Sequence, residues 1–201
     1  APGNPIMAVV KADAYGHGAE TVAATLSEAG VSNLAVARFS EAIALREAGI
    51  TTPITGMEGI YTVDDLKQAV ASNIHVVLHD PIQIETLLAA PPIVGQTKIW
   101  LKLETGMNRL GLLPHEASHY TALIRNIAWC RELGYMTHMA SADEPDKTST
   151  QLQLRRFNEF IHTAMPRESH TSDLLSTANS ACICAWPEAH NGWVRPGIML
   201  Y

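Results

Sequence analysis

Short apolar segments alternate with helical patterns along almost the whole chain. The expected strands lie near residues 6–10, 34–37, 53–57, 74–78, 98–103, 133–138, 173–177 and 197–201. They are nearly continuous apolar runs, which is typical of strands buried on both faces. Strands that alternate with helices form βα units and a parallel sheet. Eight such units favour a closed (β/α)8 barrel of the TIM type, although periodicity by itself does not distinguish it from an open sheet.

Helix start and stop signals stand between these strands. The expected helices cover residues 17–29, 40–48, 62–71, 81–90, 114–123 and 150–165. Ser40 is the expected cap of one helix, Gly49 ends it, and Pro81 occupies the first position of another. Residues 139–149 are rich in Asp, Pro, Ser and Thr, which predicts a long loop between a strand and the next helix.

Composition restricts the classes of function. The 201 residues are 47% hydrophobic and 17% charged, which is enough to build one sizeable core. A net charge of −6 without a basic run argues against a nucleic-acid partner. The apolar stretches are too short to span a bilayer. No signal peptide is visible, which is weak evidence because both ends of the chain look cut; a cytoplasmic location is expected. The chain begins at Ala1 without a methionine and ends inside an apolar run, so we expect a barrel truncated at both ends.

Two residue pairs have a spacing that could suit a metal. Cys182 and Cys184 form a Cys-x-Cys pair, and His115 and His119 stand one helical turn apart. The cysteines lack a second Cys/His pair at a zinc-like spacing, and the histidines lie in a polar helix. We therefore expect buried cysteines, a solvated histidine face and no metal site.

The segment from Val9 to Gly18 carries the clearest chemical signal. An apolar strand ends on Lys11, and a glycine-punctuated turn with Tyr15 follows. A lysine at the end of a buried strand is costly unless it reacts or finds a partner. When partly desolvated, its amine loses its proton more easily and can condense with a carbonyl group. The alternative is a lysine whose stem is buried and whose head reaches solvent.

Other polar residues fall at the expected carboxyl ends of strands, where barrels gather their chemistry. These segments are Lys102 to Gly111, His138 to Ala140 and Asn179-Ser180. The polar segment Trp193 to Ile198 instead leads into the eighth expected strand. Their cationic and hydrogen-bond-donating groups outnumber their carboxylates. The combination favours an anionic, phosphate-bearing ligand over a metal ion.

In this order and spacing, the segments resemble the alanine racemase family of pyridoxal-phosphate (PLP) enzymes. The resemblance covers nearly the whole chain, from Ala8 to Tyr201, and includes Ala142-Asp143-Glu144 after His138. It implies a (β/α)8 barrel that binds PLP and acts on L-alanine and D-alanine. PLP-dependent decarboxylases with related barrels share the lysine but are not expected to carry the 102–111 pattern.

The resemblance implies a role for each residue that would hold PLP. Lys11 would bind the cofactor covalently and then act as a base. Tyr15, Ser180 and the backbone amides of Gly197 and Ile198 would hold the phosphate. A glycine suits this task because it lets the backbone approach an anion closely.

Four further residues receive roles from the same resemblance. Arg195 would face the pyridine nitrogen and keep it unprotonated, because arginine only donates hydrogen bonds. This would favour racemisation over transamination. His138 would bond to Arg195; the sequence does not exclude the alternative of a strand-end histidine satisfied locally. Arg109 would contact the phenolic oxygen and the substrate carboxylate, and Lys102 would be carbamylated to orient it; otherwise Lys102 is an ordinary lysine of the barrel.

Racemisation by two bases needs a proton-transfer group on each face of the substrate. In the family the second base is a tyrosine of a carboxyl-terminal β domain, contributed by the other subunit of a homodimer. No tyrosine of residues 1–201 matches it, so we expect this chain to be the barrel domain of a bacterial enzyme that supplies D-alanine for peptidoglycan. By itself this domain is expected to be inactive. The alternatives are a PLP-storing barrel without catalysis and a racemase of another amino acid such as serine.

Overall fold

A computed structural model describes residues 1–164 and 175–201 and has the predicted α/β architecture. Its parallel sheet curls so that each strand pairs with the next one in the chain. The strands are β1 (Met7–Val9), β2 (Asn33–Val36), β3 (Ile54–Gly56), β4 (Ile74–Leu78), β5 (Thr97–Lys102), β6 (Cys130–Met136) and β7 (Leu175–Ser176). This sequential order is that of a TIM-like barrel, so the predicted fold class is confirmed.

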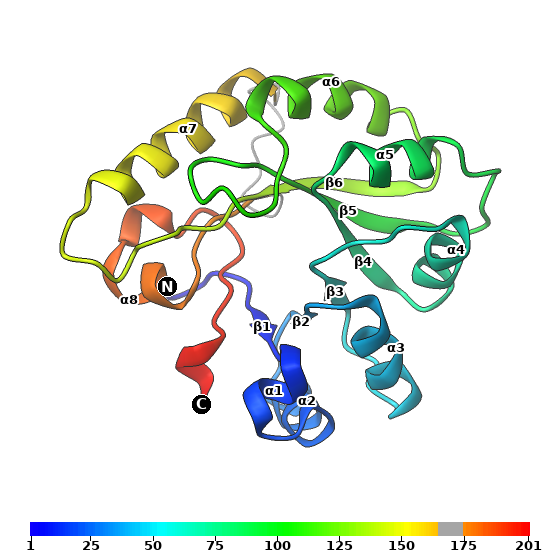
Figure 1. Ribbon diagram of the computed structural model, residues 1–201. Coiled ribbons are helices and arrows are strands. Elements are labelled where there is room, and N and C mark those ends of the chain that lie inside the picture. Colours follow the sequence, from blue (N-terminus) through cyan, green and yellow to red (C-terminus); the bar gives the residue numbers. More distant parts are fainter. Residues whose placement is uncertain (165–174) are drawn as a thin grey trace.

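Residues 193–196 take the eighth place in the ring. The amide of Met7 donates to the Val194 carbonyl at 2.9 Å, and that of Val9 donates to the Pro196 carbonyl at 2.9 Å. On the other side, the amide of Trp193 donates to the Leu175 carbonyl at 2.8 Å. Figure 1 shows the end of the chain returning beside β1, and these bonds connect the two ends of the sheet.

The prediction that residues 197–201 form the eighth strand was wrong. Ile198–Leu200 form a short 3-10 turn, and the Ile198 side chain is 64% exposed. The apolar run suggested burial, but nothing in the described part of the chain covers it. The segment in the eighth place contains Arg195, an inward-facing polar residue that hides the strand pattern. Residues 173 and 174 of the seventh predicted strand lie outside the described residues.

Helices cover the outer side of the curled sheet (Figure 1). They are α1 (Lys11–Gly16), α2 (Ala19–Glu28), α3 (Phe39–Glu47), α4 (Val63–Ala71), α5 (Pro81–Leu88), α6 (Pro114–Ile124), α7 (Thr148–Ala164) and α8 (Ser180–Ala185). The expected helices are present within a few residues, and Met165 lies outside the described residues. Ser40 was the wrong cap, because α3 begins one residue earlier with Arg38 at its N-cap. No helix in residues 1–164 or 175–201 has the length and apolarity needed to cross a membrane.

Both faces of the strands are buried, as their apolar runs predict. The larger core lies between sheet and helices, and a smaller one, with Met7, Val77 and Trp100, fills the interior of the barrel. Cys182 is buried, but Cys184 is exposed, so the expectation of buried cysteines was only half right. Above the inner core, at the carboxyl ends of the strands, polar side chains line the opening of the barrel.

Leu66 in α4 provides a test of the outer core. Its side chain is fully buried at 0% exposure, whereas Val94 is 99% exposed. We expect Leu66→Ala to lower the free energy of unfolding by about 2–5 kcal/mol because it removes buried methyl groups and leaves a cavity. Val94→Ala should change it by less than about 0.5 kcal/mol. Urea unfolding measures both, and equal effects would contradict the assigned core.

Candidate active site

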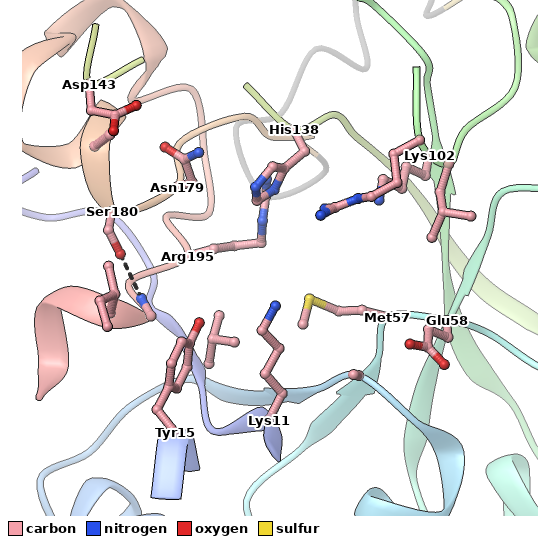
Figure 2. Close-up of a pocket in the computed structure, with 17 residues that line it drawn as sticks. Lys11, Tyr15, Met57, Glu58, Lys102, His138, Asp143, Asn179, Ser180 and Arg195 are labelled. Carbon is pink, nitrogen blue, oxygen red and sulfur yellow. Dashed lines mark hydrogen bonds between the residues drawn. The ribbon is translucent and has the colours of Figure 1, made fainter. Parts of the chain in front are cut away.

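A cavity of about 440 Å³ opens at the carboxyl ends of the strands. All the site residues predicted from the sequence line it: Lys11, Tyr15, Lys102, Arg109, His138, Ser180, Arg195, Gly197 and Ile198. Figure 2 shows the Lys11 amine pointing into the cavity, toward the side occupied by Arg195, His138 and Lys102. The fold therefore brings together residues from opposite ends of the chain, such as Lys11 and Ile198.

Lys11 stands where the strand backbone passes into an unusual turn. Residues Ala12 to Tyr15 all have φ between 52° and 55° and form a left-handed helical turn without any glycine. Left-handed geometry costs an L-residue about 1–2 kcal/mol, and such strain persists only where the surrounding structure holds it. The turn carries Tyr15 back to the cavity beside Lys11.

A small cradle lies between the two ends of the ring. The Gly197 amide donates to the Ser180 hydroxyl oxygen at 2.9 Å, and a Cβ on Gly197 would lie 2.6 Å from the Tyr15 hydroxyl oxygen (Figure 2). Burial raises the pKa of Tyr15, so its hydroxyl stays protonated and can donate. A backbone amide and two hydroxyls in one place form a donor set suited to an anion such as phosphate.

Arg195 is 4% exposed and has neutral partners. Its guanidinium donates to the Ser176 hydroxyl and to the carbonyl oxygens of Thr137 and Thr177. Burial lowers the pKa of Arg195 to about 10, which still leaves it protonated at neutral pH. The expected bond with His138 is not among the hydrogen bonds recorded in the described residues, although both side chains line the cavity.

Burial and the positive charge of the cavity lower the pKa values of two other basic residues, Lys102 and His138. Burial, followed by the charges of Arg195 and Arg109, lowers the pKa of Lys102 to about 8. Burial and the charge of Arg195 lower the pKa of His138 to about 3, so its ring is neutral at physiological pH. A negatively charged ligand would relieve this repulsion.

Arg109 reaches the cavity from a loop that returns to its own strand. The amide of Leu112 donates to the Lys102 carbonyl at 2.9 Å, which closes the loop. Inside it, the Glu104 carboxylate accepts from the amides of Gly106 and Asn108. This carboxylate clamp fixes the backbone that carries Arg109.

Several functional neighbours were not predicted. Met57 and Glu58 line the cavity and follow β3 directly. Their position at the carboxyl end of a strand is the signal that could have identified them. Gln153, which is 1% exposed, comes from α7 and donates to the His138 carbonyl at 3.0 Å while accepting from the Ala140 amide at 2.9 Å. No local sequence pattern marks Gln153, because its partners are brought to it by the packing of α7.

Nothing in residues 1–164 or 175–201 groups three or more His, Cys, Asp or Glu side chains as a metal site would. His115 and His119 lie on α6. The donor set of the cavity consists of ammonium, guanidinium, hydroxyl and amide groups, which bind anions rather than metal ions.

Residues 1–201 match the family described as "Alanine racemase, N-terminal domain" over their full length. The chain belongs to the alanine racemase family. It is 40% identical over 202 residues to the alanine racemase of Shewanella sediminis, covering all of this chain and 54% of that protein. It is 38% identical over 205 residues to the biosynthetic alanine racemase of Escherichia coli, with the same coverage.

The fold agrees with solved alanine racemase structures. The biosynthetic enzyme of Pseudomonas aeruginosa superimposes with a TM-score of 0.91 at 36% identity, over 100% of this chain and 54% of that one. An alanine racemase of Clostridium difficile in complex with cycloserine gives a TM-score of 0.89 at 30% identity, over 100% and 55%. The chain thus spans about half the length of the alanine racemases it matches.

The cradle can be tested with inorganic phosphate. We expect Gly197→Ala to weaken phosphate binding because the added Cβ would press on the Tyr15 hydroxyl. Since the contact is with the hydroxyl, Gly197→Ala should cost less in a Tyr15→Phe background, with a coupling of about 1 kcal/mol. Titration followed by ³¹P NMR measures all four proteins. Purely additive losses would mean that Gly197 and Tyr15 do not share one anion site.

Proposed function

We propose that the chain is the cofactor-binding barrel of a PLP-dependent alanine racemase, an isomerase that interconverts L-alanine and D-alanine. The observation that carries this proposal is one cavity that holds Lys11, an anion cradle and two arginines. The family match and the bacterial relatives named alanine racemase support the same reaction. Supply of D-alanine for peptidoglycan in the cytoplasm is part of the proposal.

The residues present fit PLP. The close approach of Gly197 to Tyr15 leaves no room for a side chain, as expected where a backbone amide must reach a phosphate. Tyr15, Ser180 and the amides of Gly197 and Ile198 would hold that phosphate. The cationic surroundings of Lys102 and Arg195 suit the negative charges of the cofactor and of a substrate carboxylate. When bound, PLP supplies an electron-withdrawing ring that acidifies the Cα–H bond of an attached amino acid.

Within this site, each remaining residue has one task. Lys11 would bind the cofactor through its amine and, once released, take or return the proton at the substrate Cα. Arg109 would orient the substrate carboxylate. Arg195 would face the ring nitrogen and would only donate hydrogen bonds to it. Although burial lowers the pKa of Arg195 to about 10, the guanidinium is still charged at neutral pH. This arrangement favours proton return to Cα, and therefore racemisation over transamination.

A tyrosine outside residues 1–201 would carry out the second proton transfer. We infer that this tyrosine belongs to a carboxyl-terminal β domain and that the other subunit of a homodimer contributes it. Tyr15, the tyrosine that lines the described part of the cavity, is a different residue, and its hydroxyl lies beside Gly197 in the cradle. Residues 1–201 would then form the barrel domain of a longer enzyme.

Lys11 gives the decisive test. In the full-length protein loaded with PLP, borohydride reduction and peptide mapping should find the label on Lys11. Lys11→Ala should lower the interconversion of L- and D-alanine, followed by circular dichroism, at least about 10²-fold, because a positioned base is lost. Lys67→Ala, at a surface lysine paired with Asp64, is the control and should have no effect.

Label on a different lysine would contradict the assignment of Lys11. L-serine, tested alongside, determines whether alanine is the preferred substrate. Residues 1–201 alone, assayed in the same way, should be nearly inactive; turnover equal to that of the full-length enzyme would contradict the second domain.

Lys102 is proposed to carry a carbamate. Its amine is buried in the mouth next to Arg195 and Arg109, and its pKa is lowered to about 8. The neutral amine would add to CO₂, forming an N–C bond and releasing one proton to solvent. The product is an anion that pairs with these arginines, which replaces repulsion between cations by attraction.

Carbamate on Lys102 should therefore increase with pH. Below about pH 8 most of the amine is protonated, and this form cannot attack CO₂, whereas above that pH the neutral form dominates. With ¹³C-bicarbonate at constant dissolved CO₂, we expect a protein carbamate signal in ¹³C NMR that grows between about pH 7 and 9. Lys102→Arg should abolish it. A signal that survives this substitution belongs to another amine.

A further inference from the structure

The Glu41 carboxylate joins two segments that are distant in sequence. One oxygen accepts from the Arg38 amide at 2.8 Å, which is the bond that the third residue of a helix makes to the N-cap amide in a capping box. The Arg38 side chain has no acceptor for the reciprocal bond. The other accepts from the Ala12 amide at 2.6 Å, across 29 residues. Ala12 directly follows Lys11, so Glu41 contacts the backbone that leaves this lysine.

The turn that begins at Ala12 needs external support. It consists of four left-handed residues without glycine, and Asp13 is the one among them whose residue type adopts this conformation at times. Within the turn, the Ala14 amide donates to the Val10 carbonyl at 3.0 Å. The bond from Ala12 to Glu41 holds the first amide of the turn from a different helix. A bond to a charged acceptor is stronger than one between neutral groups.

Backbone amides on both sides of Lys11, those of Val10 and Ala12, are tied to the same neighbouring segment. Before the lysine, the Val10 amide donates to the Ala35 carbonyl of β2 at 2.8 Å. After it, the Ala12 amide donates to Glu41, which follows β2 by one short connection. The Cα of Lys11 thus lies between two anchors. Loss of the second would free the backbone on the side of the strained turn.

We propose that Glu41 is a positioning residue for Lys11, in addition to its role as a helix cap. It holds the Lys11–Ala12 peptide so that the lysine side chain starts from one fixed direction into the cavity. The inference rests on the proposed function, in which Lys11 carries the cofactor. A displacement of about 1 Å at such a group reduces the rate of reaction by up to about a hundredfold.

Glu116 provides a matched control. It is likewise the third residue of its helix, α6, and its carboxylate accepts from the amide of the N-cap residue Leu113 at 2.8 Å. It is half-buried, as Glu41 is, and it does not line the cavity. Glu116→Ala therefore reports the cost of losing a cap, whereas Glu41→Ala reports the cap together with the bond to Ala12.

The first measurement is independent of PLP. Hydrogen exchange of the peptide that spans Val10 to His17 is followed in the full-length, cofactor-free protein. We expect Glu41→Ala to raise exchange at Ala12 and its neighbours at least about tenfold, since a local opening is no longer opposed by a charged hydrogen bond. Glu116→Ala should leave the exchange rate of this peptide unchanged. Its thermal midpoint of unfolding should fall by about as much as that of Glu41→Ala.

The second measurement separates positioning from binding. The rate at which Lys11 captures added PLP is followed by absorbance, and PLP affinity without capture is measured in a Lys11→Ala background. Glu41→Ala should slow capture about ten- to a hundredfold and leave the affinity within about twofold. Glu41→Gln keeps one acceptor oxygen, so it should restore part of the capture rate.

The outcomes distinguish this inference from the proposed function. Capture by another lysine in the wild-type protein would contradict the proposed function, while hydrogen exchange would still decide whether Glu41 holds the turn. Unchanged exchange in Glu41→Ala, or equal changes in Glu41→Ala and Glu116→Ala, would overturn the positioning role. So would a normal capture rate in Glu41→Ala.

Discussion

The hydrogen bonds from residues 193–196 to β1 and to the residues around β7 close the ring, and the geometry of the site depends on this closure. They carry Arg195 and Gly197, near the end of the chain, to Lys11 and Tyr15, near its start. Because all strands are parallel, their carboxyl ends meet in one mouth. Residues with no local relation in sequence thereby share a cavity of about 440 Å³.

Closure also concentrates positive charge in a partly desolvated place. Arg195 is buried against hydroxyl and carbonyl oxygens, which satisfy its donors without neutralising its charge. Lys102 and His138 respond with lowered pKa values of about 8 and about 3. Burial of unpaired charge is costly in a folded protein. The arrangement is therefore prepared for a ligand with several negative charges, which agrees with the chemistry of PLP and an amino acid carboxylate.

Backbone strain and carboxylate clamps recur at the two loops that carry the polar side chains. The turn after Lys11 is left-handed, and Glu41 holds its first amide. The loop before Arg109 includes Asn108 at φ 56°, and Glu104 accepts from its amide at 2.7 Å. In both cases a carboxylate replaces the regular hydrogen bonds that such a backbone cannot make. Glu41 and Glu104, which do not line the cavity, thus hold the backbone beside Lys11 and Arg109.

The sequence by itself determined the class of fold and the composition of the site. Continuous apolar strands that alternate with helices imply a parallel sheet, and polar residues at the carboxyl ends of strands must then face a common mouth, so Lys11, Lys102 and Arg109 could be placed together in advance. Arg195 precedes the eighth expected strand, and the family resemblance assigned it to the same site. Tertiary structure decided the rest. The eighth strand was misplaced because Arg195 interrupts its apolar pattern, and the exposed run at Ile198 imitated a strand. The left-handed turn and the contacts of Glu41 and Gln153 were invisible because they depend on groups brought close by packing, whereas local patterns report only the preferences of neighbouring residues.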